Sequence, residues 1–249
     1  MRNLFGIFST SLLIVSCTDE RVNLLDLQEV RTRHDKIIDS VKQQLTQDPL
    51  NRKLLAEFGK ACLSKSRFEH ELSWTGEWGT LAHPKLAEAP LVASLPLLES
   101  VLTVDTTSAD LYALLGRIYL ELWRIKQLTY FSEYHPLKDK AAKALSKALT
   151  LDSLRVEAML DSARLVLLNR GAWRASFSSE LARAEELTQR AIQLDPENGM
   201  AYFRYGQVFA RISRSLSSAE SDEAYRKAIT AYRKAIKLGV DDASVYLQM

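Results

Sequence analysis

Apolar residues recur at helical spacing along this chain, beginning with the segment from residue 21 to residue 47. Its apolar positions are Val22, Leu25, Leu27, Val30, Ile37, Ile38, Val41 and Leu45. Spacing of this kind places the apolar side chains on one side of a helix, and Asp48-Pro49 ends the pattern. The chain shows no run of alternating apolar and polar residues, the pattern typical of half-buried strands. We therefore predict an all-helical chain that opens with an amphipathic helix.

After this helix, one arrangement of bulky and small residues returns four times. The copies contain Tyr202, Tyr205, Gly206, Phe209 with Ala228, Tyr232, Ala235; Tyr112, Leu115, Gly116, Tyr119 with Ala141, Leu145, Ala148; Met159, Ala163, Val166 with Ala184, Thr188, Ala191; and, more weakly, Leu55, Phe58, Gly59, Cys62. Aspartate marks the ends of the copies, at Asp48-Pro49, Asp105-Thr106, Asp152-Ser153 and Asp195-Pro196. Each copy predicts two helices that approach closely at small residues and bury their apolar sides against the next copy.

These residues resemble the tetratricopeptide repeat, a two-helix unit of about 34 residues. The resemblance implies an all-α, right-handed solenoid of antiparallel helix hairpins. About four repeats are expected, over residues 52–106, 109–153, 156–196 and 199–240, with a partial copy at 243–249. The bulky positions Leu55, Tyr112, Met159, Tyr202 and Tyr246 are 57, 47, 43 and 44 residues apart, so each hairpin is longer than the family unit. Another two-helix solenoid, with a period of about 40 to 47 residues, is an alternative.

The first residues of the chain predict export. Arg2 is followed by the apolar run Leu4–Val15, which is too short to span a bilayer. Ile14-Val15-Ser16-Cys17 resembles the bacterial lipobox, which implies cleavage after residue 16 and acylation of Cys17. Residues 1–16 are then a signal peptide, and residues 17–48 a lipidated N-terminus with a capping helix. An ordinary secretory leader is the alternative. Thr18 at the second mature position favours the periplasmic face of the outer membrane.

The charge balance argues against nucleic acid as a partner, and the cysteine content argues against a disulfide. The chain has 33 basic and 31 acidic residues, a balance that argues against nucleic acid, because binding to phosphates needs concentrated positive charge. With Cys17 acylated, the other cysteine, Cys62, has no partner for a disulfide. Its position in the repeat predicts a small buried hydrophobic residue rather than a redox thiol.

The resemblance also implies a binding surface, because tetratricopeptide arrays bind extended peptides on a concave face lined by the first helix of each repeat. The corresponding positions are Lys60, Arg117, Arg164 and Gln207, with Arg204 and Arg211 nearby. Basic residues in register predict an acidic or C-terminal segment as ligand. The alternative is a solvated row of cations paired with Asp110, Glu121, Glu157 and Asp161. Pro96 is expected to disturb the second helix of the first repeat.

Aromatic residues gather in the parts of the hairpins that exceed the family repeat. Trp74, Trp78, Trp123, Tyr130 and Trp173 all lie there. They form either a secondary core between lengthened hairpins or an aromatic patch that meets a partner. The sequence does not separate the two interpretations.

We find no pattern typical of catalysis or cofactor binding. His34, His70, His83 and His135 are scattered, and His70-Glu71 lacks the second histidine of a zinc helix. We therefore predict no catalytic, metal or cofactor site. The predicted function is that of a non-enzymatic, lipid-anchored adaptor of the bacterial envelope. The alternative is an accessory lipoprotein of a periplasmic transport system, in which Trp123, Tyr130 and Trp173 line an enclosed cavity.

Overall fold

The computed structural model describes residues 24–73, 83–130, 135–168, 177–214, 216 and 218–240, and within them it contains helices and turns but no strand. The helices of a first unit are α1 (Leu24–Gln47), α2 (Arg52–Ser73), α3 (Pro84–Val104), α4 (Ala109–Tyr130), α5 (His135–Leu151) and α6 (Val156–Leu167). Those of a second unit are α7 (Phe177–Leu194), α8 (Gly199–Ser213) and α9 (Ser218–Lys237). The predicted all-helical class, built of antiparallel hairpins, is confirmed. The leader, Cys17 and the partial copy at 243–249 lie outside the described residues.

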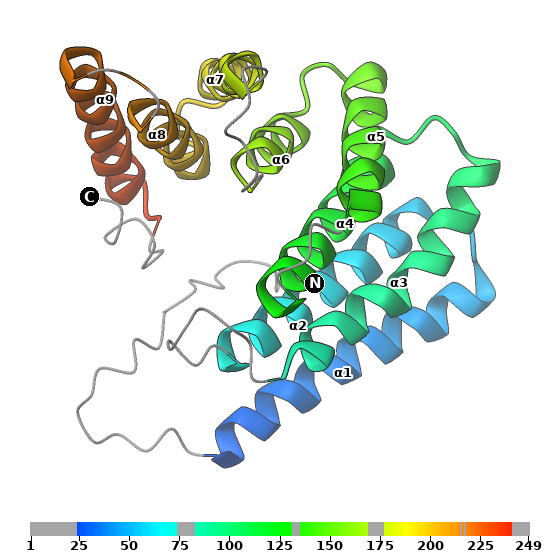
Figure 1. Cartoon of the computed structure of the whole chain (residues 1–249). Helices are drawn as coiled ribbons and strands as arrows, with labels where there is room; N and C mark the ends of the chain where they lie inside the picture. The colour runs from blue at the N-terminus through cyan, green and yellow to red at the C-terminus, as the bar shows by residue number, and fades with distance from the viewer. Residues whose placement is uncertain are drawn as a thin grey trace. The chain divides into compact units, whose positions relative to one another are not determined.

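In the first unit, the initial helices of successive hairpins form one row. α4 packs against α2 on one side and α6 on the other, while α3 and α5 pack against α4 as the returning helices (Figure 1). α1 packs against α2, at the start of the row. α6 belongs to this unit and α7 to the second, so the hairpin predicted over residues 156–196 is divided between the two units.

One turn structure recurs four times, and it explains the aspartates seen in the sequence. The backbone N–H groups of Asp48, Asp105, Asp152 and Asp195 each donate to the carbonyl four residues earlier, at 2.8–3.2 Å. In two turns the aspartate side chain accepts a hydrogen bond from Asn51 Nδ2 or Asn198 Nδ2, at 3.0 and 3.1 Å. In the other two it accepts from the backbone N–H of Thr107 or Leu154, at 3.1 and 3.0 Å. Aspartate therefore ends one helix and shapes the turn into the next.

Gly116 and Gly206 each lie where two helices approach closely. A Cβ placed on Gly116 in α4 would lie 2.6 Å from Leu145 Cγ in α5, and one on Gly206 in α8 would lie 2.6 Å from the ring of Tyr232 in α9. Tyr119 in α4 is buried, and its hydroxyl donates to a carboxylate oxygen of Glu99 in α3. Burial, followed by this hydrogen bond, raises the pKa of the Tyr119 phenol.

Cys62 is fully buried in the core of the first unit, as predicted from its position in the repeat. Burial raises the pKa of its thiol to about 12. The thiol is therefore protonated near neutral pH and a poor nucleophile.

α3 is continuous through Pro90 and Pro96, so the expected disturbance at Pro96 does not interrupt the helix. Pro96 lies on the exposed side of α3, where its ring points away from the packed core. By length and composition α3 could cross a membrane, and it is the one described helix of which this holds. One side of α3 packs against α2 and α4, which is also how the core helix of a soluble protein behaves.

Candidate functional site

A groove of about 540 Å³ crosses the N-terminal ends of the three parallel helices α2, α4 and α6. Its residues come from these helices and from the turns that precede α4 and α6. We call it the cationic groove, because five of its residues are basic and three are acidic. It is lined by Arg52, Lys53, Ala56, Lys60, Thr107, Ser108, Ala109, Asp110, Ala113, Leu114, Arg117, Asp152, Arg155 and Glu157.

The floor of the groove is made of small and apolar side chains. Ala113 and Leu114 of α4 are buried, and Ala56 of α2 is half-buried beside them. Gly59 allows the two helices to lie this close, because a Cβ on Gly59 would come within 2.6 Å of Leu114 Cδ2. The row of tightly packed first helices thus leaves a shallow channel with a neutral base and charged rims.

Three helix N-termini open into the cationic groove. Asn51 Oδ1 accepts from the backbone N–H of Leu54 at 3.1 Å, and Ser108 Oγ accepts from that of Leu111 at 3.3 Å, so α2 and α4 carry side-chain caps. α6 has Arg155 at its N-cap and no side-chain cap. The positive ends of three helix dipoles therefore add to the basic side chains around the groove.

Two of the basic side chains are held in ion pairs at the rims. Arg52 pairs with Asp105 and donates from NH2 to Thr107 Oγ1 at 3.1 Å. Arg155 pairs with Asp110 and lies 3.5 Å from a carboxylate oxygen of Glu157.

Arg117 reaches across the row of first helices, from α4 to α6. Its Nε donates to Asp161 Oδ2 at 2.6 Å. Burial alone would lower the pKa of the Arg117 guanidinium, but attraction and hydrogen bonding from Asp161 raise it. Arg117 is thus a fixed cation whose charge is largely balanced by one buried carboxylate.

Lys53 and Lys60 differ from these arginines. Both are exposed on α2, two turns apart, and no ion pair or side-chain hydrogen bond joins either of them to another described residue. Their ammonium groups are the cations of the groove most available to an acidic ligand, since an ion pair already formed has to be broken before an arginine can bind elsewhere.

Of the predicted binding residues, the structure places Lys60 and Arg117 together in the cationic groove. Arg164 in α6 does not line it. Its NH1 donates to Glu121 of α4, which also accepts from Arg124 Nε at 2.7 Å. Burial would raise the pKa of the Glu121 carboxyl, but Arg164 and Arg124 hold it well below its usual value. For Arg164 the alternative interpretation, a cation paired with a carboxylate, fits better.

The Arg164–Glu121–Arg124 cluster continues to α2, where His70 Nε2 lies 2.8 Å from Arg124 NH1. Burial, and then the positive charge of Arg124, lower the pKa of the His70 imidazole to about 4. A neutral imidazole next to a guanidinium accepts a hydrogen bond from it. This cluster ties α2, α4 and α6 together from within the row.

Gln207, Arg204 and Arg211 lie in α8, in the second unit, and each is half-buried. Arg204 NH1 donates to Gln207 Oε1 at 2.6 Å, and the Arg204 guanidinium lies 5.3 Å from the centre of the Phe203 ring. Burial lowers the pKa of Arg211, and the nearby Arg214 lowers it further. These residues form a local cluster on α8, and their use in binding stays a prediction.

Of the two interpretations of the aromatic residues, the structure favours a core position for Trp123. This side chain is 2% exposed within the core of the first unit, with the Lys138 ammonium 5.9 Å from its ring centre. α4 continues through Trp123, and the side chain lies in the core. Trp74, Trp78 and Trp173 lie outside the described residues, as does the side chain of Tyr130.

Arg52, Lys53 and Arg155 also line the groove, and none of them is among the predicted binding residues. The predicted residues lie further along the helices, whereas these three stand at helix starts. The sequence does carry a sign of these three residues, because each lies at the end of an aspartate turn or just after one.

In the part of the chain that the structure describes, no three histidine, cysteine or acidic side chains gather as metal ligands.

No model of a protein family matches this chain, and no curated protein matches it. The solved structures to which the chain is similar include two crystal structures of MamA. One is 20% identical, with 85% of this chain and 96% of that chain covered and a TM-score of 0.49. The other is 19% identical, with 88% of this chain and 90% of that chain covered and a TM-score of 0.46. Similarity of this degree carries no conclusion about partner, activity or location.

Proposed function

We propose that this chain is a non-enzymatic adaptor of the bacterial cell envelope, anchored by lipid on Cys17, whose cationic groove binds an acidic segment of a partner protein. The observation that carries the binding step is the pair Lys53 and Lys60, exposed without ion pairs among the described residues, beside three helix N-termini. An extended segment with carboxylates at alternate positions meets cations on both rims of such a groove.

The geometry favours an acidic ligand over a basic or neutral one. Two of the three acidic residues of the lining, Asp110 and Glu157, are already paired with Arg155. The third, Asp152, accepts a hydrogen bond from the backbone N–H of Leu154, so the three carboxylates offer little to a cationic ligand. The neutral floor of Ala56, Ala113 and Leu114 accommodates small side chains between the charged contacts.

Lipid anchoring rests on Ile14-Val15-Ser16-Cys17 and on the apolar run before it. Multiple acyl chains hold a protein permanently at a bilayer, because each buried methylene contributes about 0.8 kcal/mol. Radiolabelled palmitate incorporated in the native host, compared between the natural chain and Cys17→Ser, tests this step. The proposal predicts label on the natural chain and none on the variant.

The alternative function, an accessory of a periplasmic transport system, would be supported by an enclosed cavity lined by aromatic side chains. Trp123 instead fills the core of the first unit. We therefore keep the adaptor as the proposed function.

Binding is tested by fluorescence anisotropy with a labelled eight-residue peptide that alternates glutamate and alanine. We expect Lys53→Gln with Lys60→Gln to weaken binding at least about tenfold, since hydrogen bonds to charged groups contribute about 1.5 to 3 kcal/mol each. The matched control is Lys143→Gln with Lys147→Gln on α5, which changes the net charge equally, away from the groove. Equal losses in both double variants, or no binding by the natural chain, would contradict the proposal.

A further inference from the structure

Two exposed leucines stand in the turns that precede α2 and α6. Leu50 and Leu154 are each 56% exposed, and each lies two positions after the aspartate of its turn, Asp48 or Asp152. Aliphatic side chains that stand singly on a surface are common and need no explanation. These two recur at one position of a repeated turn, so their exposure is a feature of one edge of the first unit.

The turn between them carries a threonine at the same position. Thr107 lies two positions after Asp105 and lines the cationic groove. Its backbone N–H donates to the Asp105 carboxylate at 3.1 Å, and that of Leu154 donates to the aspartate of its own turn at 3.0 Å. The two turns share this hydrogen bond, so Leu154 has the place beside α6 that Thr107 has beside α4. We call the row of Leu50, Thr107 and Leu154 the turn edge.

Side chains that line the cationic groove join the three turns into one row. Arg52, two residues after Leu50, donates from NH2 to Thr107 Oγ1 at 3.1 Å. Arg155, directly after Leu154, pairs with a carboxylate in the first turn of α4. The turn edge therefore runs along the side of the groove at which the three helices begin.

The spacing of the turn edge fits an extended segment. α2 packs against α4, and α4 packs against α6, and the axes of packed helices lie about 8 to 10 Å apart. Leu50 and Leu154 are therefore about 16 to 20 Å apart. An extended chain advances about 3.3 Å per residue, and its side chains alternate between two faces. Two side chains of one segment that contact both leucines from the same face are thus about six residues apart.

We propose that the turn edge is part of the binding surface, and that the acidic partner segment carries two aliphatic side chains, about six residues apart, that contact Leu50 and Leu154. This inference rests on the proposed function and deepens it, because it names the residues that flank the carboxylates of the ligand. Aliphatic contacts at both ends select among acidic segments, which the charge of the groove alone does not distinguish.

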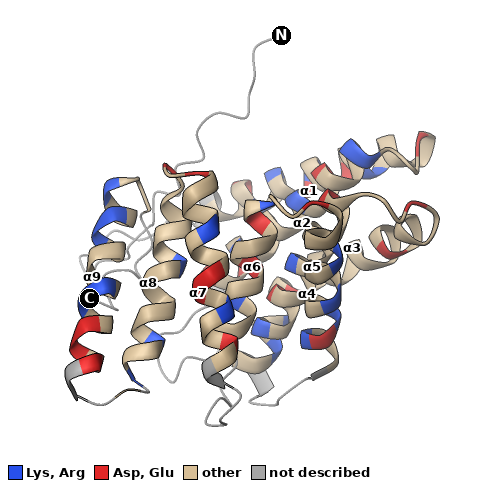
Figure 2. Ribbon diagram, turned by 90° about the horizontal axis from the view of Figure 1, so that it is seen from above, with Lys and Arg blue, Asp and Glu red and all other residues tan. Residues whose placement is uncertain are grey.

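A lipid surface or a second copy of the chain fits the turn edge less well. A bilayer cannot follow a row of side chains into a groove with charged rims, and the ribbons of α2 and α4 carry acidic as well as basic positions (Figure 2). In a symmetric dimer the same patch faces itself, which places one cationic groove against another, and like charges at an interface are unfavourable. A segment with carboxylates between its aliphatic residues avoids both difficulties.

The test extends the anisotropy assay to three labelled peptides of eight residues and equal charge. The first alternates glutamate and alanine, beginning with glutamate. The second has leucine in place of alanine at positions 2 and 8, and the third has leucine at positions 4 and 6. We expect the second peptide to bind at least about fivefold more tightly than the first, because its leucines and those of the turn edge leave water together. The third should gain no more than about twofold, since at most one of its leucines reaches the turn edge.

Leu50→Gln with Leu154→Gln is expected to remove the gain of the second peptide and to leave the affinity for the first within about twofold. Both leucines are exposed, so the change is expected to leave folding intact. The matched control is Leu86→Gln with Val92→Gln on α3, where the two side chains are 46% and 51% exposed. This variant keeps the full gain.

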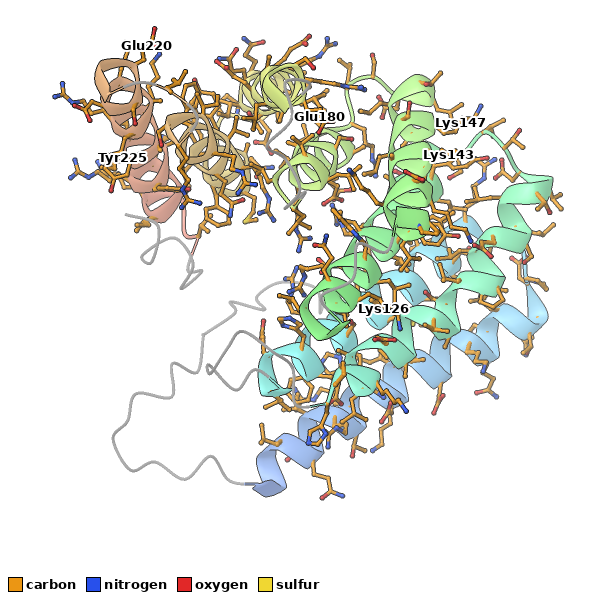
Figure 3. The ribbon with its side chains drawn as sticks, viewed as in Figure 1. Lys126, Lys143, Lys147, Glu180, Glu220 and Tyr225 are labelled. Carbon is orange, nitrogen blue, oxygen red and sulfur yellow. The ribbon has the colours of Figure 1, made fainter. Side chains whose placement is uncertain are left out.

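Lys143 and Lys147, which are exposed on α5 and do not line the groove, provide the charge control (Figure 3). Lys143→Gln with Lys147→Gln is expected to keep the full gain of the second peptide. Lys53→Gln with Lys60→Gln is expected to weaken all three peptides, because it removes the cations that bind their carboxylates.

The outcomes separate this inference from the proposed function. A second peptide that binds no more tightly than the first, or equal gains by the second and third, overturns the inference while the proposed function stands. No binding by the first two peptides overturns both. Sedimentation with vesicles of phosphatidylethanolamine and phosphatidylglycerol that Leu50→Gln with Leu154→Gln abolishes overturns the inference in favour of a lipid surface. A dimer in sedimentation equilibrium that this variant dissociates overturns it in favour of a second copy.

Discussion

Arg117 in α4 and Asp161 in α6 are joined by a hydrogen bond of 2.6 Å from Nε to Oδ2, which links two successive first helices beside the cationic groove. The pair has two effects on the molecule. It holds the row of helices together, and it balances most of the charge that Arg117 would otherwise present to a ligand.

The variant Asp161→Asn is therefore expected to change stability and peptide binding in opposite directions. Asp161 is buried, so losing its charge leaves the Arg117 guanidinium poorly compensated and is expected to lower the free energy of unfolding by about 1 to 3 kcal/mol. The freed guanidinium is expected to raise the affinity for an acidic peptide several-fold. Urea unfolding and peptide anisotropy measure the two effects. The control is Glu157→Gln at the exposed rim, for which we expect a change of no more than about 0.5 kcal/mol in stability. A lower peptide affinity in Asp161→Asn would contradict this assignment of Arg117.

Gly59 and Gly206 provide a matched comparison of helix contacts. A Cβ on Gly59 meets the flexible end of Leu114, whereas a Cβ on Gly206 meets the rigid ring of Tyr232. Alanine gains about 1 kcal/mol in helix propensity over glycine at either position. We expect Gly59→Ala to be nearly neutral and Gly206→Ala to destabilise by about 1 to 3 kcal/mol, as measured by thermal unfolding. Equal effects would show that Tyr232 moves as freely as Leu114.

Tyr119 is expected to contribute mainly through packing. Tyr119→Phe loses the hydrogen bond to Glu99 and is expected to cost about 1 kcal/mol, whereas Tyr119→Ala leaves a cavity and is expected to cost about 3 to 5 kcal/mol. Denaturant unfolding measures both. Because Tyr119 does not line the cationic groove, the phenylalanine variant should bind the acidic peptide as the natural chain does. A larger loss in Tyr119→Phe than in Tyr119→Ala would contradict this order.

His70 makes stability depend on pH. Its folded pKa of about 4 lies below the ordinary value of 6.5, so between these values the unfolded chain binds a proton that the folded chain does not. Stability is therefore highest above pH 6.5 and falls as the pH drops toward 4. Allowing for partial solvent exposure, we expect a loss of about 1 to 2 kcal/mol from pH 7 to pH 5.

The variant His70→Gln should reduce this pH dependence. Burial also lowers the pKa of His34, so a smaller slope of the same sign remains in the variant. The comparison is made between pH 7 and pH 5, and the titration of the carboxyl groups is common to both chains, so it cancels in the difference between them. An unchanged slope in His70→Gln would contradict the assignment to this imidazole.

Much of the fold could be predicted from sequence, because its determinants are local. The aspartates of the four turns, the close contacts at Gly116 and Gly206, and the burial of Tyr119 and Cys62 all follow from residue type at a fixed position in the repeat. The division between α6 and α7 could not be predicted, since it depends on how many contacts cross that point of the chain.

The candidate site was only partly predictable. Lys60 and Arg117 were found through their place in the repeat, and the structure brings them into one groove. Arg164 lies at a corresponding position, but a carboxylate one helix away, on Glu121, engages it. Trp123 lies in α4 and is buried in the core of the first unit. The ion pair of Arg164 and the burial of Trp123 depend on which side chains meet in the folded chain. The spacing of residues along one sequence does not give this information.

Binding of an acidic segment is tested most directly with a photo-crosslinking amino acid at Ala109, in the lining of the cationic groove, in the chain as it exists in the cell envelope. The control places it at Arg226, on the exposed side of α9. We expect crosslinks from position 109 to an aspartate- and glutamate-rich segment of a partner, lost when Lys53→Gln with Lys60→Gln is added and absent from position 226. Crosslinks to the same segment from both positions, or crosslinks from position 109 to a basic segment, would contradict the proposed function.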